Sequence, residues 1–151
     1  MGPLQIEKAA DEHGHPGAWV ALDPGAEPVF VAQHHWIGVD LDGTLAHFGC
    51  DWPHDYKLIG EPIPAMVERT RRWIADGEDV RIFTARMDCF HPIFGKVPAE
   101  NVRRPIEEWC LKHLGKVLPI TNRKDYWCKA IYDDRAHNVE TDTGRLTEEE
   151  R

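Results

Sequence analysis

The chain has 151 residues, 42% of them hydrophobic and 29% charged, which is the composition of one ordinary globular domain. The formal net charge of −8 disfavours binding to nucleic-acid backbones and to anionic lipid surfaces, because both are also negative. No apolar run approaches the roughly 20 residues that a membrane-spanning helix needs, so we expect no membrane association.

The N-terminal part of the chain predicts a tail followed by a β-hairpin. Residues 1–17 lack the basic and apolar regions of a secretory signal peptide, and we expect a flexible tail there. The β-rich runs 18–22 and 29–33 flank Asp23, Pro24 and Gly25, which are residues typical of turns. This arrangement predicts an N-terminal hairpin.

From residue 36 onward, strand and helix patterns alternate. The pattern predicts strands over 36–41, 79–84, 116–121 and 129–134, and helices over 63–74 and 102–114. Pro105 interrupts the second helix, which therefore either begins near it or is kinked there. The alternation predicts a Rossmann-like three-layer α/β/α fold with a mostly parallel sheet, in one domain over 18–140. Residues 141–151 are charged and predict a flexible C-terminal tail.

Several polar residues lie at or just beyond the carboxyl ends of the predicted strands. The carboxyl ends of parallel strands meet at one edge of a sheet, so we expect these side chains to lie close together. At about 4 Å and an effective dielectric near 20, each pair of carboxylates repels by roughly 4 kcal/mol. A divalent cation would relieve this repulsion, and an all-oxygen set of ligands favours Mg²⁺. The residues concerned are Asp40, Asp42, Thr84, Asp133 and Asp134, with Lys124 after the third strand.

This set of residues suits phosphoryl transfer. The cation and the lysine would stabilise the charge on the transferring group, and the hydroxyl of Thr84 would bind one of its oxygens. One aspartate can act as the nucleophile and form an aspartyl-phosphate. The turn at Gly43 would bring Asp42 to a position from which it protonates the leaving oxygen and later activates water.

The motifs VDLDGT, IFTAR, TNRKD and IYDDRA occur in this order between Trp36 and Val139. Together they resemble the haloacid dehalogenase superfamily of aspartate-nucleophile phosphohydrolases, and the DxDGT motif is the most specific of them. The resemblance implies that Asp40 is the nucleophile and a Mg²⁺ ligand. It implies that Asp42 is the general acid and base and binds the metal through its backbone carbonyl. Asp133 and Asp134 match the acidic fourth motif.

The same resemblance implies catalytic roles for Thr84 and Lys124. Lys129 is an alternative to Lys124, and which of Asp133 and Asp134 binds the metal directly stays open, with analogy favouring Asp134. The phosphate of the substrate is expected at Leu41, Asp42, Gly43, Thr84, Ala85, Arg86 and Lys124. Arg86 and Arg135 would either contact this phosphate or form salt bridges with the acidic loops.

The expected function is Mg²⁺-dependent hydrolysis of a small phosphomonoester, with a nucleotide as one possible substrate. The loops 45–61 and 87–98 are too short for a folded cap domain, so we expect an open site. His47, Phe48, Trp52, His54 and Tyr56 would form a stacking surface for a base or would seal the loop against the core. The alternatives are a receiver-like signalling domain that accepts a phosphoryl group, and a catalytically idle phosphate-binding module. Binding to nucleic acid is expected only at a phosphorylated end.

The four cysteines are far apart and show no CxxC spacing, which is typical of reduced thiols in the cytoplasm. Cys50 with His54, and Cys89 with His91, have ligand types that suit zinc, although their spacing matches no standard zinc motif. They form either a second metal site or ordinary loops.

Overall fold

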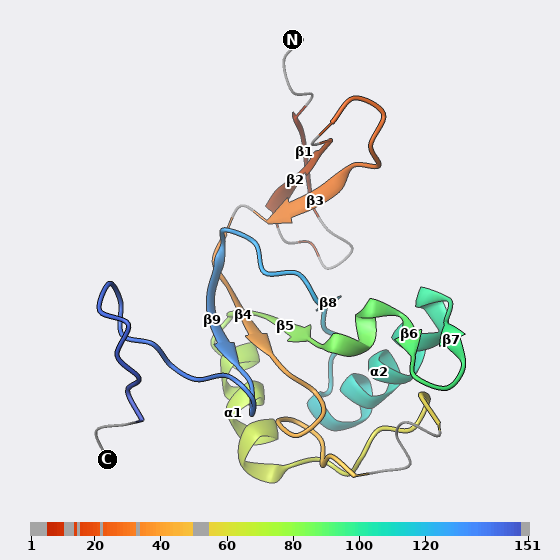
Figure 1. Ribbon diagram of the computed structural model, residues 1–151, viewed down its shortest axis with the longest axis vertical. Coiled ribbons are helices and arrows are strands. Elements are labelled where there is room, and N and C mark those ends of the chain that lie inside the picture. Colours follow the sequence, from red (N-terminus) through yellow and green to blue (C-terminus); the bar gives the residue numbers. More distant parts are fainter. Residues whose placement is uncertain are drawn as a thin grey trace.

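The protein is a mixed α/β structure in which a four-stranded parallel sheet packs against two helices (Figure 1). The computed structural model describes residues 6–10, 14, 16–21, 23–32, 34–49 and 55–148. A separate three-stranded antiparallel sheet precedes the parallel sheet in the chain. The parallel sheet and its helices match the expected α/β class.

The parallel sheet has the strand order β8-β5-β4-β9, and its central pair is formed by the strands expected at 36–41 and 79–84. All three strand pairings are parallel, so the carboxyl ends of the strands lie at the same edge. All residues of β4 are buried, which explains why its sequence is continuously apolar. The bounds of the strands are Trp36–Val39 for β4, Asp79–Phe83 for β5, Ile120–Thr121 for β8 and Cys128–Tyr132 for β9.

The two helices are α1, Pro64–Ala75, and α2, Ala99–Leu114. Each is followed by a glycine with positive φ, Gly77 after α1 and Gly115 after α2, whose N–H groups donate to carbonyls of the last helical turn. Pro105 lies inside α2, so the helix begins before it rather than at it. Since proline has no N–H, the carbonyl of Asn101 receives no helical hydrogen bond from that position.

Both helices lie on one face of the parallel sheet. They contact each other, and their apolar residues belong to the same buried cluster as Ile37 and Val39 of β4. On the other face the Trp36 ring lies near Phe83 and beneath the guanidinium of Arg81. The connection from β8 to β9, residues 122–127, contains no helix. Within the described residues the sheet therefore has one helical layer, and the second layer of the expected three-layer arrangement is missing from them.

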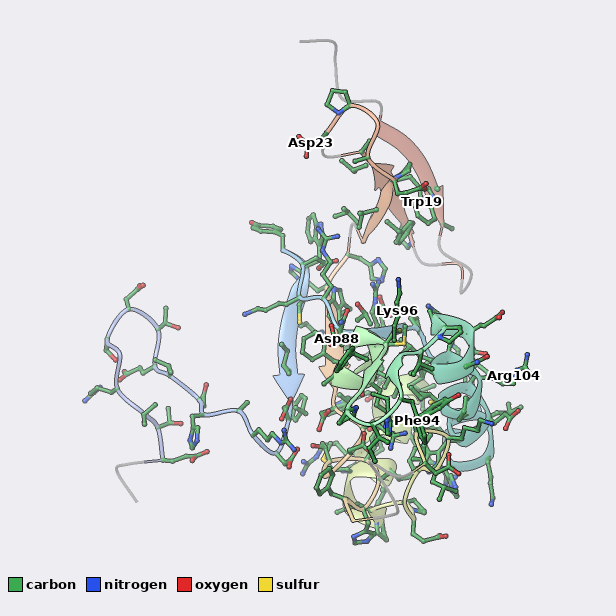
Figure 2. All side chains as sticks on the ribbon, turned by 45° about the vertical axis from the view of Figure 1, so that its right-hand side comes forward. Trp19, Asp23, Asp88, Phe94, Lys96 and Arg104 are labelled. Carbon is green, nitrogen blue, oxygen red and sulfur yellow. The ribbon has the colours of Figure 1, made fainter. Side chains whose placement is uncertain are left out.

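The antiparallel sheet consists of β1, Ile6–Ala10, β2, Pro16–Val20, and β3, Val29–Ala32. Strands β2 and β3 form the expected hairpin, but β1 lies within the segment expected to be a tail, so that expectation was wrong for 6–10. A Cβ atom at Gly17 would lie 2.1 Å from the ring of Phe30, so glycine lets this ring cover the strand. Figures 1 and 2 show this sheet, with Trp19, beyond the end at which β4 begins, away from the carboxyl edge.

Short elements border the carboxyl edge of the parallel sheet. The 3₁₀ turn η1, Ala85–Asp88, follows β5 and leads into a small hairpin made of β6, Phe90–His91, and β7, Gly95–Lys96. Figure 2 shows Phe94 and Lys96 on this hairpin, to which we refer as the flap. In the described parts of 45–61 and 87–98, the helices and strands are the end of η1 and the flap.

The C-terminal segment leaves the sheet after β9 (Figure 1). It turns back on itself through a bridge between Val139 and Leu146, and Arg145 pairs with Glu140 within the turn. It therefore has local structure where a flexible tail was expected. Over the part of the chain that the structure describes, neither helix combines the length and apolar character needed to cross a bilayer.

The packing of α2 on the sheet can be tested with two truncations on the same helix. Ile106 is fully buried, so we expect Ile106→Ala to lower the free energy of unfolding by about 2–5 kcal/mol through lost burial and the cavity it leaves. Leu111 is 58% exposed, and Leu111→Ala should cost no more than about 0.5 kcal/mol. Urea unfolding of both variants measures the difference, and similar losses would contradict the described orientation of α2.

Candidate active site

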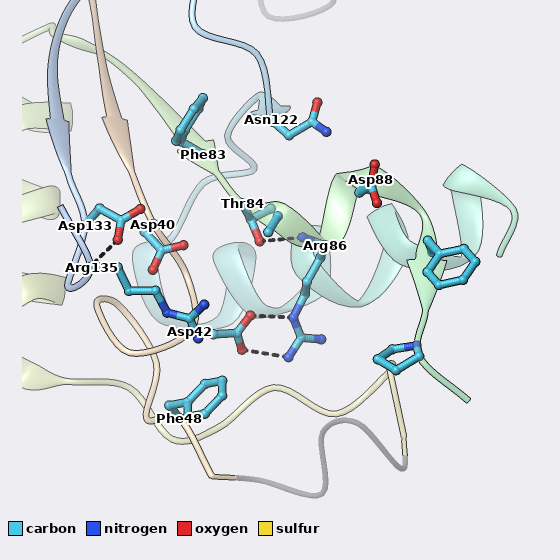
Figure 3. A pocket seen from close by; sticks show the side chains of 13 residues that line it. Asp40, Asp42, Phe48, Phe83, Thr84, Arg86, Asp88, Asn122, Asp133 and Arg135 are labelled. Atoms are coloured by element: carbon cyan, nitrogen blue, oxygen red, sulfur yellow. Dashed lines mark hydrogen bonds and ion pairs between the residues drawn. The ribbon is translucent and has the colours of Figure 1, made fainter. Parts of the chain in front are cut away.

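Three aspartates, Asp40, Asp133 and Asp134, lie close together where β4 and β9 end. Figure 3 shows two of them, Asp40 and Asp133. Asp40 directly follows β4, and Asp133 and Asp134 directly follow β9. One carboxylate oxygen from each residue lies within 4.8 Å of those of the other two. The Asp40 N–H donates to the carbonyl of Tyr132 at 2.9 Å, which continues the pairing of the two strands up to the site. The structure thus brings together three of the four carboxylates expected at this edge.

The position of this cluster follows from the strand order. From β4 the chain proceeds through α1 to β5 and through α2 to β8, always in the same direction along the sheet. It then crosses back to place β9 on the other side of β4. Since the connections diverge between β4 and β9, a crevice forms at their carboxyl ends, which is the usual position of ligand sites in open α/β sheets.

The turn after β4 is shaped to fit Asp134. Gly43 has a φ of +90°, and a Cβ atom there would lie 2.5 Å from the Oδ2 atom of Asp134. Glycine is therefore required both by the backbone conformation and by the close approach of the carboxylate. The prediction of a turn at Gly43 is confirmed. Because glycine has no side chain, the acidic residues that follow β9 can approach the turn that follows β4.

Thr44 links the two strand ends and was not among the residues singled out from the sequence. Its hydroxyl lies 3.3 Å from Asp40 Oδ2 and 3.3 Å from Asp134 Oδ1, and it accepts a hydrogen bond from the Asp134 N–H at 3.1 Å. A hydroxyl has one hydrogen to donate, so the two carboxylates share it. The threonine of the DGT sequence was the available signal for this role.

Burial, together with the neighbouring carboxylates, raises the pKa of Asp40 from 3.8 to about 7. Burial is the main cause, followed by the charge of Asp133 and by the hydrogen bond and charge of Asp134. The Leu41 N–H, which bonds to the Asp40 carboxylate, acts in the opposite direction. Without a cation, Asp40 therefore retains a proton up to near-neutral pH.

Asp42 does not join this cluster but forms an ion pair with Arg86. The guanidinium donates from Nε to Oδ2 at 2.6 Å and from Nη2 to Oδ1 at 2.7 Å (Figure 3). Its remaining contacts include the backbone carbonyls of Tyr56 and Leu58, each at 2.9 Å. The Arg86 side chain is only 4% exposed. Of the two roles considered for Arg86, the structure shows the salt bridge.

Thr84 lies at the end of β5, as expected, and is buried. Its hydroxyl accepts a hydrogen bond from the Arg86 N–H at 3.2 Å, which begins η1. Thr84, Ala85 and Arg86 line the same cavity as Asp40 and Asp42. Leu41 was also expected to bind phosphate. Its side chain is buried, and its backbone N–H donates a hydrogen bond to the Asp40 carboxylate.

The structure does not place Lys124 in the cavity that contains Asp40. Lys124 is exposed and lines a neighbouring cavity of about 720 Å³, to which Gly43, Asp133 and Asp134 also contribute. The alternative, Lys129, lines the same neighbouring cavity and pairs with Glu78 at 2.6 Å. Neither lysine therefore contacts Asp40 in this conformation, and the third-motif lysine stays a prediction.

The cavity that contains Asp40 has a volume of about 590 Å³. Arg135 borders it, and its N–H donates to Asp133 at 2.8 Å while its guanidinium lies 5.7 Å from the centre of the Phe48 ring. No sequence motif marks the flap, whereas Phe83 and Asn122 lie within the IFTAR and TNRKD motifs but had no role assigned to them. The cavity-wall residues that sequence reasoning missed are Phe83, Asp88, Phe90, Pro92 and Asn122.

The possible second metal site falls partly outside the described residues. Cys50 and His54, together with Trp52, are among the residues that the structure does not describe. Cys89 directs its thiol to the Met87 carbonyl at 3.3 Å. The Nδ1 atom of His91 accepts hydrogen bonds from the backbone N–H groups of Ile93 and Phe94, at 3.0 and 3.1 Å. The described residues of this loop thus already have local partners.

The raised pKa of Asp40 predicts that this carboxylate destabilises the metal-free fold. Folding raises its pKa from 3.8 to about 7. The contribution of protonated Asp40 to the free energy of unfolding is therefore fully present below about pH 4 and is lost as the pH rises through 7. In EDTA at pH 8 we expect Asp40→Asn to be more stable than the unmodified protein by about 1–2 kcal/mol, after discounting for solvent screening. This corresponds to a Tm increase of about 3–6 °C.

At pH 4 the difference should vanish, because both proteins then carry a neutral group at position 40. Thermal unfolding at the two pH values provides the measurement. Added Mg²⁺ should raise the Tm of the unmodified protein and not that of the variant. A variant that is less stable at pH 8 would show that Asp40 is not under electrostatic strain.

Comparison of the chain with protein-family models, with curated proteins and with solved structures finds no match.

Proposed function

We propose that the protein is a Mg²⁺-dependent phosphohydrolase that acts on a small phosphomonoester through an aspartyl-phosphate at Asp40. The observation that carries this proposal is the approach of Asp40, Asp133 and Asp134 to within 4.8 Å at the end of two adjacent parallel strands. Three carboxylates at this distance are able to hold a hard cation, and Asp40 also borders the open cavity in which a substrate could bind.

The donor set fits magnesium. All three side chains offer carboxylate oxygens, and the pKa of Asp40 is raised by burial and by its acidic neighbours, so a divalent cation would relieve a repulsion already present. Asp40 and Asp134 would hold the ion, with Asp133 as the alternative to Asp134 and the Asp42 carbonyl as a further ligand by family resemblance. When bound, Mg²⁺ would neutralise the charge on the phosphoryl oxygens.

The residues would then divide the reaction as follows. An Asp40 oxygen attacks phosphorus while the bond from phosphorus to the ester oxygen breaks, and Asp42 gives its proton to the departing alcohol. Water next attacks the aspartyl-phosphate, Asp42 accepts a proton from that water, and the bond between phosphorus and Asp40 breaks. Inorganic phosphate leaves, and Asp40 and Asp42 return to their starting states.

The ion pair between Asp42 and Arg86 sets a condition on this mechanism. Asp42 cannot donate a proton while both of its oxygens accept hydrogen bonds from Arg86. A phosphate entering the cavity is a competing partner for the guanidinium, because planar N–H donors bind phosphate oxygens as well as carboxylates. Transfer of Arg86 donors from Asp42 to the phosphate would leave the Asp42 carboxylate free to take up a proton from solvent, which it then gives to the departing alcohol.

The fold supports this function over a receiver domain. Numbered along the chain, the parallel strands have the order 3-2-1-4, the first part of the doubly wound Rossmann order, whereas receiver domains have the order 2-1-3-4-5. The acidic residues here follow the first and the fourth strands. The motifs shared with the haloacid dehalogenase superfamily favour the same choice, and the described free thiols Cys89, Cys110 and Cys128 fit a cytoplasmic enzyme.

A second candidate, a catalytically idle phosphate-binding module, is favoured by one observation. The bidentate pairing of Asp42 with a buried arginine is the arrangement expected if Asp42 had only a structural role. Such a module would bind Mg²⁺ and phosphate without hydrolysing any ester. Turnover of a phosphomonoester therefore separates the two candidates.

We expect the purified protein to hydrolyse p-nitrophenyl phosphate in Mg²⁺, and EDTA to abolish this activity reversibly. Asp40→Asn should lower kcat by at least about 10³-fold, because the nucleophile is lost. Asp42→Asn should lower kcat by about 10²- to 10⁴-fold, as is typical for loss of a general acid. Asp76→Asn makes the same chemical change at the exposed end of α1 and serves as the matched control. Undiminished activity of Asp40→Asn would reject the proposed nucleophile.

A further inference from the structure

The cavity beside Asp40 has an apolar wall as well as an acidic one. Phe48, Phe83, Phe90 and Pro92 contribute to its lining. In Figure 3 the rings of Phe48 and Phe83 lie on either side of the aspartates, while Phe90 belongs to the flap. The aromatic residues thus come from three separate segments of the chain and meet around the same space.

Core packing does not account for two of these rings. Phe48 is 57% exposed and Phe90 is 63% exposed, and neither belongs to the buried hydrophobic cluster. A phenylalanine side chain left in water forgoes roughly 1.5–3 kcal/mol of burial free energy. Exposed aromatic rings that line a concave site are typical of surfaces that stack on a flat ligand.

Polar groups with hydrogen-bonding edges border the same space. Asn122 follows β8 at the carboxyl edge and is exposed, and its amide offers both donors and an acceptor. The guanidinium of Arg135 lies over the Phe48 ring, 5.7 Å from its centre, and its own plane offers a further surface on which a flat ligand can stack. A ligand that fits these groups has a flat aromatic part with polar atoms at its edge.

The size of the cavity agrees with a ligand larger than phosphate. Its volume of about 590 Å³ falls within the roughly 300–1,000 Å³ typical of small-molecule sites. The acidic residues that would receive the phosphate contribute to one part of the lining, and the flap contributes to another. The space between them would accommodate a sugar or linker of moderate length.

We infer that the substrate is a nucleoside monophosphate, with its phosphate at Asp40 and its base against Phe48 and Phe90. This inference rests on the proposed phosphohydrolase function and adds the class of leaving group to it. It excludes sugar phosphates as preferred substrates, because they present no flat aromatic ring to the aromatic wall.

The test compares nucleoside 5′- and 3′-monophosphates with ribose 5-phosphate in the presence of Mg²⁺. Stacking of a base on an aromatic side chain corresponds to a roughly 10- to 100-fold effect, so the best nucleotide should exceed ribose 5-phosphate in kcat/KM by at least about 10-fold. Phe90→Ala should reduce this ratio severalfold. Ile93→Ala, on the same flap but outside the cavity lining, should leave the ratio unchanged.

Equal kcat/KM values for nucleotides and ribose 5-phosphate would overturn the inference and leave the phosphohydrolase function intact. Hydrolysis of no ester at all would instead reject that function. In that case calorimetric binding of the same nucleotides and of ribose 5-phosphate to the full-length protein with Mg²⁺ decides the inference. Tighter binding of a nucleotide, reduced by Phe90→Ala, supports it, and equal or undetectable binding rejects it.

Discussion

The carboxylates of Asp40, Asp133 and Asp134 are forced together by the pairing of β4 with β9, and the rest of the site is arranged around their mutual repulsion. Their oxygens lie within 4.8 Å of one another, and the pKa of Asp40 rises to about 7 as a result of burial and these neighbours. Gly43 makes room for the Asp134 carboxylate, and Thr44 shares its hydroxyl between Asp40 and Asp134. The fold therefore maintains a repulsion between carboxylates that the proposed cation would relieve.

Arg86 connects this acidic cluster to the loops that surround it. It neutralises Asp42, the fourth carboxylate, and binds the carbonyls of Tyr56 and Leu58 in the loop before α1. Through its position at the start of η1 it also lies next to Thr84. One buried guanidinium thus determines where Asp42 points and fixes part of the cavity wall. A phosphate that attracts Arg86 would change both the orientation of Asp42 and the cavity wall. Substrate binding would thereby control whether Asp42 is available for proton transfer.

The strand-end residues could be predicted from sequence, because parallel strands bring their carboxyl ends to one edge whatever the details of packing. This reasoning located Asp40, Thr84, Asp133 and Asp134. It could not decide whether Arg86 binds a carboxylate or a phosphate. That choice depends on the distance in space between Arg86 and Asp42, which are 44 residues apart in the sequence. Lys124 was expected beside Asp40, but its place depends on the irregular path of 122–127. The strand β1 was missed because its sequence, IEKAA, has little β-forming character.

The proposed function requires Asp40 and at least one of Asp133 and Asp134 to bind the same divalent cation. The most direct test is anomalous diffraction from crystals soaked in Mn²⁺, which substitutes for Mg²⁺ at oxygen sites and can be located by its scattering. A shared cation site should give an anomalous Mn²⁺ peak between Asp40 and the pair Asp133 and Asp134, within coordination distance of oxygens from both strand ends. The absence of a peak there, or a peak only at other carboxylates, would contradict it.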